Sequence, residues 1–171
     1  MPTIREYDIG CEPSPSEPAE TLIQNGRSAF LLFFAVSKTV DESGYLKDLR
    51  VAIVECKGCV ATKFAYPTDE GRPEHPLFAL GLGELPTRTA EVVDSPWVEE
   101  VTSQMEASVK RIWVDGRGMD PGPSDGDPAR HFVVLLKELT FECIATELEV
   151  AKYAKTFDEA IRHVIDRQGE D

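Results

Sequence analysis

Two cysteines in the segment Cys56-Lys57-Gly58-Cys59 have the spacing of half a zinc site. Thiolates placed this way on a tight turn present their sulfurs to one tetrahedral ion, and a structural zinc site needs four ligands. The sequence has no second CxxC motif and no HxxxH motif, so the remaining ligands would have to come from isolated residues. These are Cys11, Cys143, His75, His131 and His163. Zinc binding at Cys56 and Cys59 is therefore one alternative hypothesis.

The same pair is also a candidate for thiol redox chemistry. A reactive thiolate is typically stabilised at the N-terminus of a helix. Residues 51–54 and 60–62, which flank the pair, are apolar or β-branched and favour strands, so no helix dipole is expected there. We therefore interpret Cys56 and Cys59 as small, partly buried thiols that flank a hairpin turn, with a zinc or thiol site as the alternative.

A second set of candidate residues lies in or next to residues 67–86. This segment is rich in glycine, proline and charged residues, and long irregular connections of this kind are often functional. Tyr66, Arg72, His75 and Trp97 are the side chains suited to line a pocket beside it. The resulting alternative is a small enzyme or a small-ligand-binding protein. The other interpretation is that these side chains only pack within the loop. Convergence of the four side chains on one concave site would favour the pocket over packing.

The segment Gly122-Pro123-Ser124-Asp125-Gly126 matches the GxSxG pattern of serine hydrolases. That motif works where the serine occupies a sharp turn between a strand and a helix. Here a flexible loop followed by a strand is expected, so we assign no catalytic role to Ser124. The sequence contains no complete catalytic set that we recognise, and no cofactor is expected.

The elements that position these residues are mainly hairpins. Asn25-Gly26 favours a two-residue turn between residues 21–24 and 27–30, and the apolar residues 31–36 continue as a central strand. The alternation of residues 49–66 predicts a hairpin whose loop is Lys57-Gly58, with Cys56 opposite Cys59.

A later hairpin is predicted from residues 131–136 and 141–146, turning near Glu138-Leu139. One helix is expected to begin at Pro96 with Ser95 as its N-cap, and Trp97, Val101 and Met105 recur along one stripe of it.

The last helix has the clearest start signal. The segment Thr156-Phe157-Asp158-Glu159 has the pattern of a capping box, and apolar residues follow at helical spacing. Hairpins and two helices without regular strand-helix-strand alternation predict an α+β fold, with a mainly antiparallel sheet built from hairpins and packed against two helices.

The chain is expected to form a mobile N-terminal arm over residues 1–20 and a single α+β domain over residues 21–168. Residues 11–20 contain three prolines and three glutamates, which preclude a helix and leave little to bury. Within the domain, residues 115–130 are rich in aspartate, glycine and proline and are expected to form a mobile acidic loop.

Charge narrows the classes of partner. The 171-residue chain has a formal net charge of -13, which repels nucleic acid and anionic membranes and favours a basic protein partner. Its start lacks the apolar core of a secretory signal, and the longest apolar run, residues 29–36, is far shorter than the roughly 20 residues that span a bilayer. The leading hypothesis is therefore a non-catalytic cytoplasmic binding or protein-interaction module. The sequence does not predict an oligomeric state.

The sequence resembles a family of bacterial proteins of unknown function in several blocks. These are residues 62–70 (TKFAYPTDE), 75–82 (HPLFALGL), 91–98 (EVVDSPWV), 131–134 (HFVV) and 140–145 (TFECIA). The resemblance implies a shared fold but no activity, cofactor or catalytic residue. The turn Lys137-Glu138-Leu139 departs from the family, whose members tend towards His-Asp-Ser there.

Overall fold

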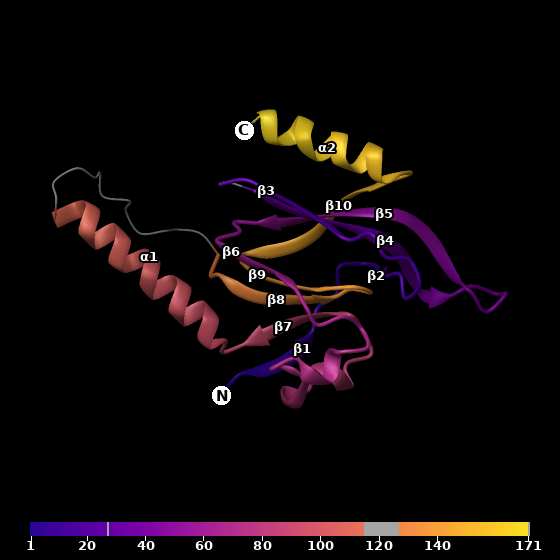
Figure 1. The fold of residues 1–171 in the computed structure, drawn as a ribbon, viewed down its shortest axis with the longest axis horizontal. Coiled ribbons are helices and arrows are strands. Elements are labelled where there is room, and N and C mark those ends of the chain that lie inside the picture. The colour runs from indigo at the N-terminus through magenta and orange to yellow at the C-terminus, as the bar shows by residue number, and fades with distance from the viewer. Residues whose placement is uncertain (27, 115–126, 171) are drawn as a thin grey trace.

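The computed structural model describes residues 1–26, 28–114 and 127–170 (Figure 1). Ser124 and most of the expected acidic loop lie outside these residues. The strands are β1 (Thr3–Glu6), β2 (Glu12–Pro13), β3 (Thr21–Gln24), β4 (Ala29–Val40), β5 (Leu46–Lys57), β6 (Ala61–Ala65), β7 (Thr89–Val93), β8 (Arg130–Leu135), β9 (Thr140–Ala145) and β10 (Glu147–Ala154). The helices are α1 (Pro96–Val114) and α2 (Phe157–Glu170), with short 3-10 turns at Arg72–Glu74, Phe78–Leu80 and Leu82–Glu84.

The strands form two antiparallel sheets that face each other (Figure 1). We call the sheet with the order β1-β7-β8-β9-β6 the first sheet, and the sheet with the order β10-β5-β4-β2 the second sheet; β3 also pairs with β4. Apolar side chains between the sheets form the main core, which includes Leu31, Phe33, Phe132 and Phe141. The predicted α+β class with antiparallel sheets is confirmed.

Strand β4 explains why residues 29–36 are apolar without alternation. Leu31 and Phe33 belong to the core between the sheets, whereas Phe30 and Leu32 belong to a second cluster beneath α2. A strand that is buried on both faces reads as a continuous apolar run.

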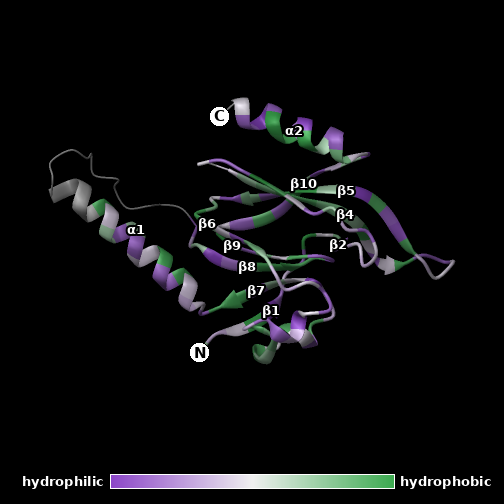
Figure 2. Cartoon of the chain, viewed as in Figure 1, coloured by the Kyte–Doolittle hydropathy of each residue, from purple (hydrophilic) through white to green (hydrophobic). Residues whose placement is uncertain are grey.

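Helix α2 covers the outer face of the second sheet (Figure 1). Thr156 Oγ1 accepts a hydrogen bond from the Glu159 N–H at 3.2 Å, and the Glu159 carboxylate accepts one from the Lys155 N–H at 3.1 Å. Apolar and polar positions alternate along the helix in Figure 2, and the apolar Phe157 ring meets Phe34 edge-on at 5.0 Å. The capped amphipathic helix predicted from the sequence is confirmed.

The packing of α2 gives a direct test in two neighbouring residues. Val164 is fully buried, whereas Ile165 is 57% exposed. We expect Val164→Ala to destabilise the protein by about 2 kcal/mol, because it removes buried methyl groups and leaves a cavity. Ile165→Ala is expected to change stability by less than about 0.5 kcal/mol. Urea denaturation of both variants measures the difference, and equal effects would contradict this packing.

Helix α1 begins at Pro96, as predicted, but extends away from the sheets (Figure 1). Trp97 and Val101 are half-buried, whereas Met105 is 49% exposed. The apolar stripe therefore packs only near its beginning, and the N-terminal end of α1 is the part that meets the first sheet.

Two of the predicted hairpins are present. Strands β8 and β9 pair with Leu135 opposite Thr140, and the Leu136 N–H donates to the Leu139 carbonyl at 3.0 Å. Strands β3 and β4 also pair, but Gln24 lies opposite Ala29 and the Asn25 N–H donates to the Ser28 carbonyl at 3.0 Å, so the register differs from that of the predicted Asn25-Gly26 turn.

The predicted hairpin around Lys57-Gly58 is wrong. Strand β5 pairs with β4 and β10 in the second sheet, whereas β6 pairs with β9 in the first sheet. The chain therefore passes from one sheet to the other at Lys57, beside Thr146, where the chain crosses between β9 and β10. The Thr146 N–H donates to the Lys57 carbonyl at 2.8 Å, which ties the two crossings together. We call this region the corner.

Part of the segment that was expected to form a mobile arm is paired in the two sheets. Strand β1 pairs with β7, β2 pairs with β4, and Cys11 is 1% exposed. The Glu12 carboxylate accepts a hydrogen bond from the Arg88 N–H at 2.8 Å. The prolines of this segment exclude a helix but are compatible with a short edge strand, which composition alone does not reveal.

The part of the chain that the structure describes contains no helix that is both long and apolar enough to cross a membrane.

Candidate functional site

A group of polar side chains lies on the outer face of the first sheet. Phe132 and Cys143 point into the core between the sheets, so their neighbours His131 and Glu142 point to the opposite face. Strand pairing aligns Lys63 with Glu142 and Val92 with His131. Four adjacent strands therefore bring one row of side chains together.

Loops complete this group on its open side. Ser95 lies between β7 and α1, Trp97 is in the first turn of α1, and His75 follows the 3-10 turn Arg72–Glu74. These elements line a cavity of about 320 Å³ that is open to solvent, which we call the histidine cavity. Its lining residues are Lys63, His75, Pro76, Leu77, Val92, Ser95, Pro96, Trp97, Glu100, His131 and Glu142.

Hydrogen bonds connect the polar residues of the histidine cavity in one chain. Ser95 Oγ lies 2.8 Å from His131 Nδ1, and His131 Nε2 lies 2.9 Å from Glu142 Oε2. The other carboxylate oxygen, Oε1, lies 3.5 Å from His75 Nε2. Both imidazole rings therefore meet the same carboxylate.

Glu142 is ionised in this setting. Burial on its own raises the pKa of the carboxyl group, but hydrogen bonds from His131 and His75, together with the charge of Lys63, outweigh it and hold the pKa at about 2. An ionised carboxylate only accepts hydrogen bonds, so the Nε2 atom of each imidazole carries the proton.

The direction of the remaining hydrogen bonds follows from this assignment. A neutral histidine with its proton on Nε2 accepts at Nδ1. The Leu77 N–H indeed donates to His75 Nδ1 at 3.1 Å, and the Ser95 hydroxyl donates to His131 Nδ1 when that ring is neutral. The chain thus runs from the Ser95 hydroxyl through His131 to the Glu142 carboxylate.

The surroundings hold this chain of hydrogen bonds in place. Ser95, His75 and His131 are each at most 6% exposed. The Trp97 ring meets His131 edge-on at 5.0 Å, and Lys63 Nζ lies 3.7 Å from the centre of the Trp97 ring. Burial strengthens the hydrogen bonds of Ser95, His75 and His131 because little water competes for these polar groups, whereas Lys63 is exposed.

A hydroxyl that donates to an imidazole, which in turn donates to a carboxylate, is the order of groups that activates serine as a nucleophile. In the serine-protease triad the serine meets Nε2 and the carboxylate meets Nδ1, whereas here the two ring nitrogens are exchanged. Ser95 also lies at the N-terminus of α1, where its carbonyl accepts the Val98 N–H at 3.1 Å. The positive end of the helix dipole favours negative charge that develops near this position. Ser95, His131 and Glu142 are therefore connected in the order of a nucleophile, a base and a group that orients the base.

The residues proposed from the sequence for this region do not all meet. His75 and Trp97 line the histidine cavity. Tyr66 is 60% exposed and hydrogen bonds to the Glu74 carboxylate. Arg72 lies beside a different surface hollow and donates to the Leu136 carbonyl at 3.3 Å.

Sequence reasoning missed the central residues Ser95, His131 and Glu142. The sequence pattern identifies Ser95 as a helix cap and His131 as the start of a strand and a possible zinc ligand, and gives Glu142 no role. The register of the late hairpin was the available signal, because it places His131 and Glu142 on one face as diagonal neighbours.

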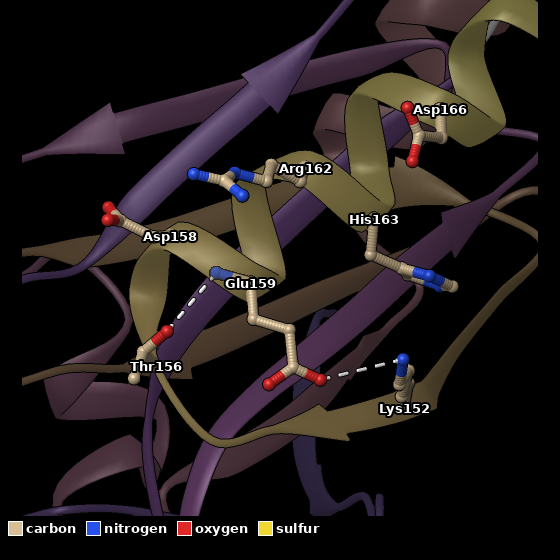
Figure 3. Close-up of a pocket in the computed structure, with 7 residues that line it drawn as sticks. All are labelled: Lys152, Thr156, Asp158, Glu159, Arg162, His163 and Asp166. Atoms are coloured by element: carbon tan, nitrogen blue, oxygen red, sulfur yellow. Dashed lines mark hydrogen bonds and ion pairs between the residues drawn. The ribbon is translucent and has the colours of Figure 1, made fainter.

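A second hollow, of about 370 Å³, lies on the polar side of α2. Figure 3 shows that its side chains point in different directions and do not converge on one point. Its contacts are local, such as the 3.7 Å ion pair between Lys152 and Glu159. We interpret this hollow as the solvated face of the helix.

The proposed metal or redox residues Cys56 and Cys59 lie at the corner, away from the histidine cavity. Cys56 is 2% exposed and Cys59 is half-buried. Cys143 on β9 belongs to the same core cluster as Cys56, and Cys59 packs against that cluster. Among the described residues, no group of three or more histidine, cysteine or acidic side chains is arranged to hold a metal ion.

Searches for similar proteins found no matching family model, curated protein or solved structure. The resemblance to a bacterial family stays a prediction.

Proposed function

We propose that the protein is a small enzyme that transfers or hydrolyses acyl groups, with Ser95 as the nucleophile. The observation that supports this proposal is the hydrogen-bonded chain at the wall of the histidine cavity. The distance from Ser95 Oγ to His131 Nδ1 is 2.8 Å, and the distance from His131 Nε2 to Glu142 Oε2 is 2.9 Å. Both lie in the normal range for hydrogen bonds and within the reach needed for proton transfer.

In the proposed reaction, Ser95 Oγ attacks the carbonyl carbon of an ester or amide while its proton moves to His131 Nδ1. The same proton then passes to the leaving group as the bond to that group breaks. Water, deprotonated by His131, releases the acyl group and restores the serine. Glu142 holds the imidazole in the required orientation and stabilises the imidazolium that forms.

The histidine cavity limits the size and character of the substrate. A volume of about 320 Å³ lies at the lower end of ligand-binding pockets, which span roughly 300 to 1,000 Å³. Leu77, Val92 and Trp97 supply apolar walls, and Lys63 supplies a positive charge beside Trp97. A small acyl group fits this lining better than an extended peptide.

Labelling with a fluorophosphonate probe tests the proposal. Such a probe reacts with activated serines, so we expect modification of Ser95 in the wild type and none in Ser95→Ala. Ser108→Ala is the matched control, because Ser108 lies on the exposed face of the same helix and donates to the Gln104 carbonyl at 2.9 Å. Mass spectrometry of the peptides measures the site. An unlabelled wild type, or equal labelling of Ser95→Ala, would contradict the assignment.

A protein-interaction module with a basic partner is our second proposal. It is supported by the net charge of -13 and does not depend on the histidine cavity. Ser95→Ala leaves the charge unchanged, so binding to a partner that persists in this variant separates the two functions.

A cytoplasmic location is supported by four cysteines that are all free thiols, as expected in a reducing compartment.

A further inference from the structure

Three cysteines meet at the corner between the two sheets. Cys56 comes from the end of β5, Cys59 from the segment before β6, and Cys143 from β9. Cys56 and Cys143 belong to the buried cluster between the sheets, and Cys59 packs against that cluster. The sequence spacing identified Cys56 and Cys59, and the fold adds Cys143.

The three thiols differ in exposure and acidity. Cys56 and Cys143 are at most 2% exposed, whereas Cys59 is half-buried. Hydrogen bonds from Cys143 and Cys56 lower the pKa of Cys59 below that of an ordinary thiol. Hydrogen bonding to Cys56 and Cys59, with burial, raises the pKa of Cys143. Cys59 is therefore the thiol of this cluster best suited to react with a reagent from solvent.

We propose that the cluster is a peroxide-sensitive site in which Cys59 is oxidised and then forms a disulfide with Cys56. The Cys59 sulfur attacks one oxygen of a hydroperoxide, the O–O bond breaks, and the other oxygen leaves with a proton as water or an alcohol. Cys59 is then a sulfenic acid. The Cys56 sulfur attacks the Cys59 sulfur, the S–O bond breaks, and water leaves. Two thiols have lost two electrons, and the peroxide has gained them.

The chain connection favours Cys56 as the partner. Lys57 and Gly58 separate Cys56 from Cys59, which is the spacing of dithiol redox motifs. Gly58 has a φ of +56°, so the connection already uses a backbone conformation that suits a tight turn. Cys143 lies in the other sheet's strand β9, where Phe132 and Thr62 pair with it from both sides. Cys56 is likewise paired on both sides, with Ala29 and Leu148, so we expect disulfide formation to depend on movement of Cys59, which lies outside the strands.

The experiment treats the protein with hydrogen peroxide, blocks the remaining thiols by alkylation, and measures the intact mass and the linked peptides. We expect the wild type to lose two hydrogen atoms, with Cys56 linked to Cys59, and dithiothreitol to restore the original mass. Cys59→Ser is expected to form no such disulfide. In Cys56→Ser the sulfenic acid on Cys59 is expected to persist and to react with dimedone.

Cys11→Ser is the matched control. Cys11 is as buried as Cys56 and Cys143, at 1% exposed, but lies directly before β2. This variant is expected to form the disulfide as the wild type does. A disulfide that involves Cys143, a disulfide that survives in Cys59→Ser, or a wild type that stays reduced would overturn the proposal. Half-buried Cys59 tolerates serine better than Cys56, so the test does not depend on the folding of Cys56→Ser.

Discussion

Ser95→Ala is expected to lower the turnover number of an activated ester such as p-nitrophenyl acetate by at least about 10⁴-fold, because removal of the nucleophile leaves only binding and electrostatic effects. We expect the turnover number to fall and KM to change little, since the small hydroxyl contributes little to substrate binding. Steady-state kinetics at pH 7 measures it.

Two controls separate chemistry from folding in this experiment. Ser108→Ala removes an exposed serine of the same helix and is expected to keep the wild-type rate. Thermal unfolding of Ser95→Ala reports any loss of stability from the hydrogen bond to His131. A variant that is less stable but equally active would show that the chain of hydrogen bonds serves the fold and not catalysis.

Glu142→Gln is expected to destabilise the protein by roughly 3 kcal/mol at pH 7. The carboxyl group has a pKa of about 2 in the folded state against an ordinary value of 4.5. At about 1.36 kcal/mol per pH unit, this difference corresponds to roughly 3 kcal/mol of stabilisation by the ionised group. Its side chain is only 13% exposed, so little solvent screening reduces the effect.

The pH dependence of this effect has a definite sign. Because folding lowers the pKa of Glu142, its contribution to stability is complete above about pH 4.5 and is lost as the pH falls towards about 2. Urea denaturation at several pH values should therefore show wild type and Glu142→Gln converging on acidification. The exposed Glu106→Gln is the control and should change stability by less than about 0.5 kcal/mol. A difference that is constant with pH would contradict the role of the charge.

Sequence patterns predicted the elements whose signals are local. The β8–β9 hairpin and α2 follow from a turn, a capping box and apolar periodicity within short segments. The corner at Lys57 could not be predicted from such local signals. The alternation of apolar and polar residues in β5 and β6 is the same whether these strands pair with each other or enter different sheets. The pairing partners β4, β9 and β10 decide this, and they are distant in the sequence.

Part of the candidate site was predictable because its signal is local, whereas the rest depends on strands that are distant in the sequence. The correct late hairpin already placed His131 and Glu142 on one face of the sheet. Ser95 joins them because β7 pairs with β8, and the hydrogen bond to His131 spans 36 positions of the chain. His75 and Trp97 were identified from their place beside an irregular segment, whereas Tyr66 and Arg72 shared that place and point elsewhere.

Strand β1 has a consequence for the behaviour of the protein in concentrated solution. It forms an edge of the first sheet and pairs with β7, whose residues Ala90 and Val92 are buried. Without β1, the backbone N–H and C=O groups of β7 would form an open edge that can pair with another chain. Strand β1 is short and carries Arg5 and Glu6, and charges on an edge strand oppose such pairing. The N-terminal segment therefore protects the sheet against aggregation as well as completing it.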